Sequence, residues 1–231
     1  MITDAALLPH PPLLFRELGG AQDPVAELRA AALDAVRVVT READRVVVVG
    51  AADTPGRWDG AAPVDARRFG TTGSRTPVGT ALPLSLGVGR RLVDEVGWGG
   101  PVELVACTWD ATGEDIEALA NELADRPERT ALLVLGDGSA RRGDKAPGYL
   151  DERAFPFDDA VADALARGDA QALCDLDPGL AEELMVFGRT VFRLLGAVAV
   201  AQQAVTQAAL TYRGDPFGVS WFVATWQLHR A

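Results

Sequence analysis

Two histidines occur in the 231 residues, and one of them, His10, lies in the run Pro9-His10-Pro11-Pro12. The prolines fix the backbone angles on both sides, so the imidazole is held on a rigid turn that suits a metal ligand or an acid/base. The alternative is a ring that only satisfies a carbonyl of the turn. The other histidine, His229, lies near the C-terminus, where chains usually fray. A mechanism that needs several histidines is therefore disfavoured.

A second candidate is the turn Gly136-Asp137-Gly138-Ser139, which follows the apolar run 130–135. The backbone N–H groups of such a turn can approach a ligand closely or cradle an anion. Asp137 is then a candidate base, or a group that orients a neighbouring donor. The alternative is a sharp turn in which Asp137 accepts backbone hydrogen bonds.

These residues need a scaffold, and the apolar patterns predict one. The β-branched run 45–50 is typical of a central parallel strand that is covered on both faces. Strands that alternate with helices of 12–20 residues indicate one α/β domain over 1–231, with a largely parallel central sheet and helices on both faces. The predicted strands are 2–8, 45–50, 102–107, 130–135 and 217–225. The predicted helices are 23–44 (opened by Asp23-Pro24), 82–96, 113–124, 157–166, 178–185 and 188–210.

In open α/β sheets the ligand crevice lies at the carboxyl ends of the strands. Four segments follow predicted strands: His10, residues 51–53, residues 108–110 and residues 137–139. We expect the chemistry of the protein at these segments. The long loop 51–81 adds to this expectation, because long loops in compact domains are often functional.

Taken together, these motifs resemble class III extradiol ring-cleavage dioxygenases of the LigB type and the related Memo-like proteins. The first signature is the strand that ends in Pro9-His10-Pro11-Pro12. The second is a Gly-Asp-x-Ser-His run, a Pro-Gly-Tyr turn and a helix that begins near Phe-Asp. Here it reads Gly136 to Arg141, then Ala146-Pro147-Gly148-Tyr149, then Phe157-Asp158. The resemblance spans nearly the whole chain and implies a LigB-like α/β fold.

The resemblance also implies ferrous iron held by two histidines and a carboxylate, with a further histidine as acid/base. His10 matches the first ligand. The loop after the second strand contains no histidine, and Asp53 is its first carboxylate. Ala140 stands at the acid/base position, and Asp215 is the acidic candidate for the third ligand. Ordinary ring cleavage is therefore not expected. One divalent metal at His10 and Asp53, of a harder type such as Mg²⁺ or Mn²⁺, and no metal at all remain equal alternatives.

Two functions follow from this pattern. The first is a diverged LigB-like enzyme of the oxidoreductase type, with His10 and Asp137 as catalytic residues and Asp53 in support. In this hypothesis the small substrate is anionic or aromatic. Its remaining contacts come from Ser139, Lys145 and Tyr149. The alternative is a non-catalytic descendant that binds a ligand or a protein partner.

The basic residues Arg141, Arg142 and Lys145 could attract a carboxylate or phosphate, and the alternative is a solvated loop. The net charge of −11, from 22 basic and 33 acidic residues, argues against nucleic acid as a partner. We find no signal peptide, and the apolar stretch 194–210 is interrupted by polar residues, so no membrane span is expected. These features predict a cytoplasmic protein that handles a small molecule.

The remaining expectations concern sulfur and aromatic residues. Cys107 and Cys174 match no metal-binding spacing, and Cys107 is expected to be a buried free thiol. Trp221 and Phe222 should face opposite sides of the last strand. One of them could then cover a crevice or a contact between subunits of a homo-oligomer.

Overall fold

The computed structural model describes residues 1–66, 81–203, 205 and 207–228, which form a mixed sheet in the order β3-β4-β2-β5-β1-β7-β6. Four neighbouring strands are parallel, and those at the two sides are antiparallel. The parallel strands are β1 (Ile2–Leu8), β2 (Arg45–Ala52), β4 (Val102–Thr108) and β5 (Thr130–Leu135). The antiparallel strands are β3 (Gly56–Asp59), β6 (Gln207–Gly214) and β7 (Trp221–Gln227).

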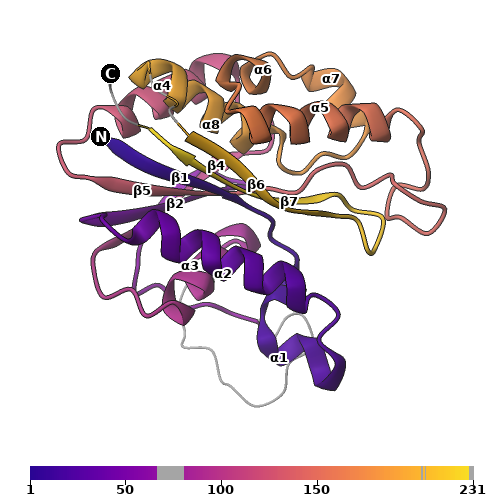
Figure 1. Ribbon diagram of the computed structural model, residues 1–231, viewed down its shortest axis with the longest axis horizontal. Coiled ribbons are helices and arrows are strands. Elements are labelled where there is room, and N and C mark those ends of the chain that lie inside the picture. The colour runs from indigo at the N-terminus through magenta and orange to yellow at the C-terminus, as the bar shows by residue number, and fades with distance from the viewer. Residues whose placement is uncertain (67–80, 204, 206, 229–231) are drawn as a thin grey trace.

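Helices cover both faces of this sheet (Figure 1). One face carries α4 (Gly113–Ala124), α5 (Ala154–Arg167), α6 (Ala170–Cys174), α7 (Pro178–Glu183) and α8 (Arg189–Gln202). The other carries α1 (Arg16–Gly19), α2 (Ala26–Thr40) and α3 (Leu84–Glu95), with short 3₁₀ turns at Pro12–Leu14 and Gly20–Gln22. The expected α/β fold with a parallel centre is confirmed. None of the described helices is long and apolar enough to cross a membrane.

Side chains alternate between the two cores along the central strands. Val47 and Val49 pack under α8 on one face, and Val46 and Val48 pack on the opposite face. A strand buried on both faces needs apolar residues at every position, which explains the unbroken valine run. Trp221 and Phe222 also divide between the two cores, as expected from the period of a strand.

The C-terminal third differs from the sequence-based prediction. The helix expected over 188–210 ends at Gln202, and the strand β6 occupies Gln207–Gly214. The buried amide of Gln202 bonds both the backbone N–H and the carbonyl of Ile2, each at 2.8 Å, which fixes the helix end against β1. Gln203 then adopts a left-handed conformation with φ 54°. The final strand begins at Trp221 rather than at residue 217.

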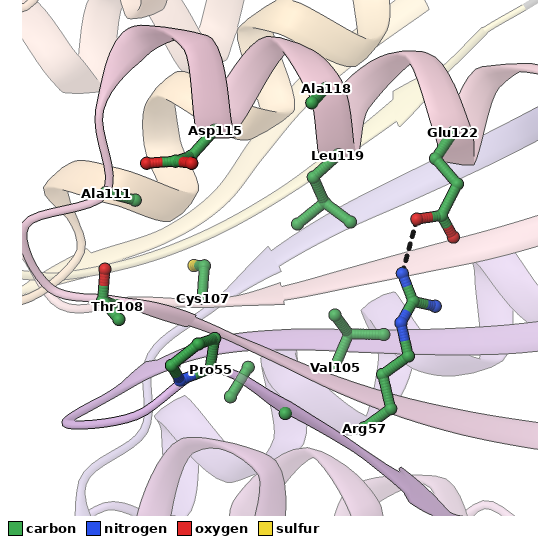
Figure 2. Close-up of a pocket in the computed structure, with 12 residues that line it drawn as sticks. Pro55, Arg57, Val105, Cys107, Thr108, Ala111, Asp115, Ala118, Leu119 and Glu122 are labelled. Carbon is green, nitrogen blue, oxygen red and sulfur yellow. Dashed lines mark hydrogen bonds and ion pairs between the residues drawn. The ribbon is translucent and has the colours of Figure 1, made fainter.

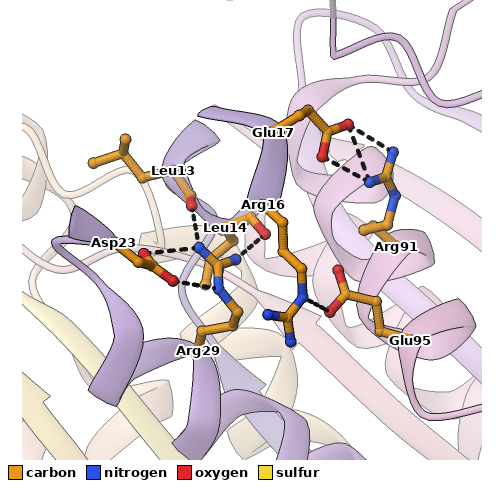
Figure 3. Close-up of polar contacts among 8 residues, drawn as sticks. All are labelled: Leu13, Leu14, Arg16, Glu17, Asp23, Arg29, Arg91 and Glu95. Atoms are coloured by element: carbon orange, nitrogen blue, oxygen red, sulfur yellow. Dashed lines mark hydrogen bonds and ion pairs between the residues drawn. The ribbon is translucent and has the colours of Figure 1, made fainter. Parts of the chain in front are cut away.

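The helix predicted from Asp23 begins at Ala26 and ends at Thr40, short of residue 44. Asp23 instead accepts the N–H of Val25 and pairs with Arg29, whose guanidinium is almost wholly buried. Figure 3 shows this guanidinium reaching from α2 to the carbonyls of Leu13 and Leu14. Arg29 therefore fixes the segment that directly follows His10. Beside this segment, two ion pairs that are more exposed to solvent, Arg16–Glu95 and Glu17–Arg91, connect α1 to α3.

Candidate functional site

The carboxyl ends of the four parallel strands meet, and a chain of side-chain contacts joins them. Asp53, after β2, accepts a hydrogen bond from Nε1 of Trp109 at 3.1 Å. Trp109 follows β4, and its ring stacks against the imidazole of His10 with centroids 6.5 Å apart and planes 30° apart. His10 follows β1, and its Nδ1 lies 3.5 Å from Oδ1 of Asp137, after β5. The four segments expected to meet therefore do so.

His10 and Asp137 form a buried pair. His10 is 6% exposed and Asp137 8% exposed. The carboxylate accepts the backbone N–H of His10 at 2.9 Å, whereas Nδ1 of the ring has no hydrogen-bond partner among the described residues. Burial raises the pKa of the Asp137 carboxyl, and the neighbouring imidazole opposes part of that rise. This arrangement can hold a proton between an imidazole and a carboxylate.

His10, Leu84 and Trp109 line two adjoining cavities. The first is about 360 Å³ and has polar groups from Asp53 and Thr54. The second is about 470 Å³ and is mainly apolar; besides His10, its lining includes Pro11, Pro12, Phe187, Phe217 and Trp221. Among the described residues, neither lining contains an arginine or a lysine. Of the described residues that line the two cavities, the charged or ionisable ones are His10, Asp53 and Asp137.

The structure places three of the expected substrate contacts elsewhere. Ser139 is fully buried, its hydroxyl donates to Oδ2 of Asp158 at 2.5 Å, and its backbone N–H donates to Oδ1 at 3.0 Å. Lys145 and Tyr149 are exposed and are not among the residues that line the His10 cavities. In the turn after β5, the side chain of Asp137 therefore points toward His10, and that of Ser139 points into the interior.

In the expected basic cluster, the charge of Arg142 is neutralised by acidic residues, and Arg141 is bonded to a backbone carbonyl. Arg142 forms ion pairs with the buried Asp158 and with Asp215. Arg141 donates to the carbonyl of Gly148 at 2.6 Å. A guanidinium that already has a carboxylate partner has little attraction left for a ligand anion. Asp215, the candidate third iron ligand, is engaged in this ion pair instead.

The residues present do not fit the iron centre that the resemblance implies. No group of three histidine, cysteine, aspartate or glutamate side chains in the described part of the chain lies close enough to hold a metal ion. His10 and Asp53 do line one cavity, but the indole of Trp109 contacts both of them. Ala140, at the position of the acid/base, is buried on the wall of the apolar cavity and has no proton to give. His229 lies outside the described residues.

A separate cavity of about 720 Å³ lies between α4 and the strands β3 and β4 (Figure 2). Its floor includes Val105 and Cys107, and an ion pair between Arg57 and Glu122 crosses its rim. Cys107, which was expected to be a buried free thiol, is a free thiol of intermediate exposure. Its partial burial still raises the pKa of the thiol to about 12. A thiol with this pKa is a poor nucleophile at neutral pH, so we assign Cys107 no nucleophilic role.

Comparison with protein-family models and with curated protein sequences gives no match. Comparison with solved structures finds the crystal structure of the uncharacterized protein JW3007 from Escherichia coli K12. The TM-score is 0.54 at 16% sequence identity, over 96% of this chain and 99% of that one. This likeness shows a shared fold along almost the full length of both chains.

Sequence reasoning missed Trp109, the residue that links the other three. It belongs to the segment 108–110, which was expected at the strand ends, but its aromatic side chain gave no signal of a role. Phe187 stands edge-on to the ring of Trp109 at 5.9 Å, and the hydroxyl of Thr190 donates to the backbone carbonyl of Trp109 at 2.9 Å. A tryptophan directly after a buried parallel strand is the feature that could have indicated it.

Proposed function

We propose that this chain is a diverged member of the LigB-like superfamily that binds a small aromatic molecule in the cavities at His10. His10 and Asp137 exchange a proton with that molecule. The observation that carries the proposal is a buried imidazole–carboxylate pair at the wall of a cavity lined by aromatic side chains. The two motifs that resemble the superfamily, Pro9 to Pro12 and Gly136 to Ser139, both contribute to this pair.

The lining favours an aromatic ligand over an anionic one. Phe187, Phe217 and Trp221 offer ring faces and edges, which pack well against another ring. The cavities contain carboxylates and no described arginine or lysine, so an anionic group would be repelled. The ligand is therefore a neutral or cationic aromatic compound, with a hydroxyl or amine for Asp53 or His10.

The imidazole has a clear role with such a ligand. Nδ1 lies on the side of Asp137, so Nε2, at the opposite edge of the ring, is the nitrogen available to a ligand. His10 takes up or delivers a proton at a polar substituent of the aromatic ring, and Asp137 stabilises the imidazolium that results. A positioned acid/base of this kind typically contributes a factor of about 10² to 10⁴ in rate.

Because the chain has two histidines, the NMR signals of the imidazole rings provide a direct test. We expect phenol and tyramine to shift the His10 ring signal in a saturable way. We expect 4-hydroxyphenylacetate to need about tenfold higher concentration, since its carboxylate meets Asp53 and Asp137. His10→Gln identifies the signal, and Tyr149→Phe, at an exposed side chain, serves as the matched control. An equal response to cyclohexanol, or no saturable shift with any of the aromatic probes, would refute the proposal.

A non-catalytic binding protein is the second candidate, and Ala140 favours it, because the cavity wall lacks the expected proton donor. If the protein converts a bound aromatic ligand, and His10→Gln slows this conversion while the affinity for the ligand is kept, the result supports the enzyme. Binding of the ligand without conversion supports the binding protein.

Metal content by plasma mass spectrometry, after anaerobic incubation with Fe(II), Mn²⁺ or Zn²⁺, adds a third readout. About one metal per chain that is lost in His10→Ala would contradict the poor fit to a metal centre described above.

The proposal includes a cytoplasmic location and self-association through aromatic residues. Both Cys107 and Cys174 are free thiols, which suits a reducing compartment. Phe187 and Phe217, at the mouth of the apolar cavity, are among the exposed large apolar side chains. Fractionation of cells and size-exclusion chromatography with light scattering test these two points.

A further inference from the structure

A fourth cavity, of about 300 Å³, is also bordered by Trp109, but His10 is not among its lining residues. It is enclosed by the segment after β4, the helix α7 and the first turns of α8. Its basic lining residues are Arg189 and Arg193, and its acidic ones are Asp110 and Glu182. This size suits a small metabolite or one end of a larger molecule.

The two guanidiniums are free to bind a ligand. Most arginines in the described part of this acidic chain have a carboxylate within 4.0 Å. Arg189 and Arg193 have no such carboxylate among the described residues. The side chain of Arg193 donates one hydrogen bond, from Nε to the carbonyl of Cys174 at 3.3 Å. The guanidinium of Arg189 makes no hydrogen bond within the described chain.

The position of Arg189 is electrostatically unfavourable on its own. It is the first residue of α8, and Gly188 at the N-cap supplies no capping side chain. A cation at this end of a 14-residue helix opposes the helix dipole. Arg193 lies four residues later, so both side chains project from the same face of the helix. An anion held between the two guanidiniums would reverse this unfavourable interaction.

We propose that this cavity binds the carboxylate group of a small organic acid between Arg189 and Arg193. A carboxylate fits the planar guanidinium with two parallel hydrogen bonds. The negative charges of the exposed residues Asp110 and Glu182 offset part of the positive potential of the two arginines. A singly charged carboxylate therefore suits the cavity better than a phosphate dianion. The site does not depend on the function of His10, although the ring of Trp109 borders both.

The test uses the indole N–H of Trp109 as a reporter in NMR spectra of the ¹⁵N-labelled full chain, with the signal assigned from Trp109→Phe. Sodium acetate or sodium phosphate is titrated against sodium chloride at constant ionic strength. We expect acetate to shift this signal in a saturable way, with a dissociation constant of about 1–10 mM, and phosphate to do so more weakly. Arg189→Gln should weaken acetate binding by about tenfold or more, and Arg189→Lys by less, because lysine keeps the charge without the planar fork.

Arg41→Gln is the matched control, since Arg41 is an exposed arginine at the C-terminal end of α2, on the face of the sheet opposite α7 and α8 (Figure 1), and does not line this cavity. It should leave acetate binding unchanged. Without acetate, Arg189→Gln should melt at the same temperature as the parent protein or higher, because it removes a cation from a helix N-terminus. Equal acetate affinity in Arg189→Gln and the parent, or shifts of the same size with chloride and acetate, would overturn the carboxylate site.

Discussion

Arg29 is expected to contribute more to stability than any of the exposed arginines near it. It is 3% exposed, and its guanidinium bonds both oxygens of Asp23 at 3.0 Å, the carbonyl of Leu13 at 2.8 Å and the carbonyl of Leu14. Arg29→Met keeps much of the apolar stem and removes all of these bonds. The two carbonyls then lose charged donors, and the Asp23 carboxylate loses its counter-ion.

The magnitude follows from these partners. Each carbonyl left without its donor costs about 1 kcal/mol or more, and breaking a buried ion pair costs about 3–5 kcal/mol. Because the side chain of Asp23 is 29% exposed, water recovers part of that cost. We therefore expect Arg29→Met to lower the free energy of unfolding by about 3 kcal/mol in total. For a chain of this size, that is a fall of roughly 6–12 °C in Tm.

Urea unfolding followed by circular dichroism measures this change. We expect the midpoint to fall by about 1 M urea with an unchanged slope. Arg91→Gln is the control, because Arg91 pairs with Glu17 at a partly exposed site of the same region, and its loss should cost less than about 1 kcal/mol. If Arg29→Met were destabilised no more than Arg91→Gln, the view that this guanidinium fixes the segment after His10 would be wrong.

Three further outcomes are expected. Because burial raises the pKa of Asp137, ionisation of that carboxyl weakens the fold as the pH rises above the unfolded value of 3.8. Asp137→Asn should therefore be at least as stable as the parent at pH 7 by urea unfolding. A clearly less stable Asn variant would mean that the ionised carboxylate is favourably paired with His10. For Glu103, the hydrogen bond from Arg126 lowers the pKa below 4.5, so its stabilisation is present above that pH and is lost as the pH falls through the folded value. Glu103→Gln should cost about 1 kcal/mol or less at pH 7, and the difference from the parent should disappear in acid. Cys107, with a pKa of about 12, should react with iodoacetamide at pH 8 roughly 1,000-fold more slowly than in urea, since its thiolate fraction falls in that proportion; peptide mass spectrometry that finds rapid native labelling would contradict its burial.

The fold was largely predictable, because a strand buried on both faces has few alternatives. The valine run of β2 and the short apolar run of β5 are typical of central parallel strands, and both have this position in the sheet. The edge strand β6 was not predictable in the same way. Its alternating, half-exposed residues follow α8 without a proline or glycine break, and Ala208, Ala209 and Leu210 continue the apolar pattern of the helix. The helix ends where Gln203 adopts a left-handed conformation, next to Gln202, whose side chain bonds Ile2. This contact joins opposite ends of the chain, so the local pattern cannot indicate it.

The site was predictable to the extent that strand ends define it. The rule that ligands lie at the carboxyl ends of parallel strands placed His10, Asp53 and Asp137 together. It could not determine where the side chains of the following turn point. Ser139 turns inward because Asp158, on α5, accepts both its hydroxyl and its backbone N–H. Such a partner is found only when the helix is in place.

The glycines of the second motif have a packing reason that is independent of any chemistry. A Cβ on Gly136 would lie 2.6 Å from the Cα of Gly188, and one on Gly138 would lie 2.8 Å from the Cβ of Ser220. Such distances require the neighbours to move, so close packing alone accounts for glycine at both positions. The motif therefore has a structural use whether or not the protein holds a metal. His10 differs from these glycines, because its buried ring makes no hydrogen bond through Nδ1 to the described residues and lies 3.5 Å from the Asp137 carboxylate. The glycines of the motif are thus tested by stability measurements, whereas the imidazole is tested by the ligand titrations proposed for His10.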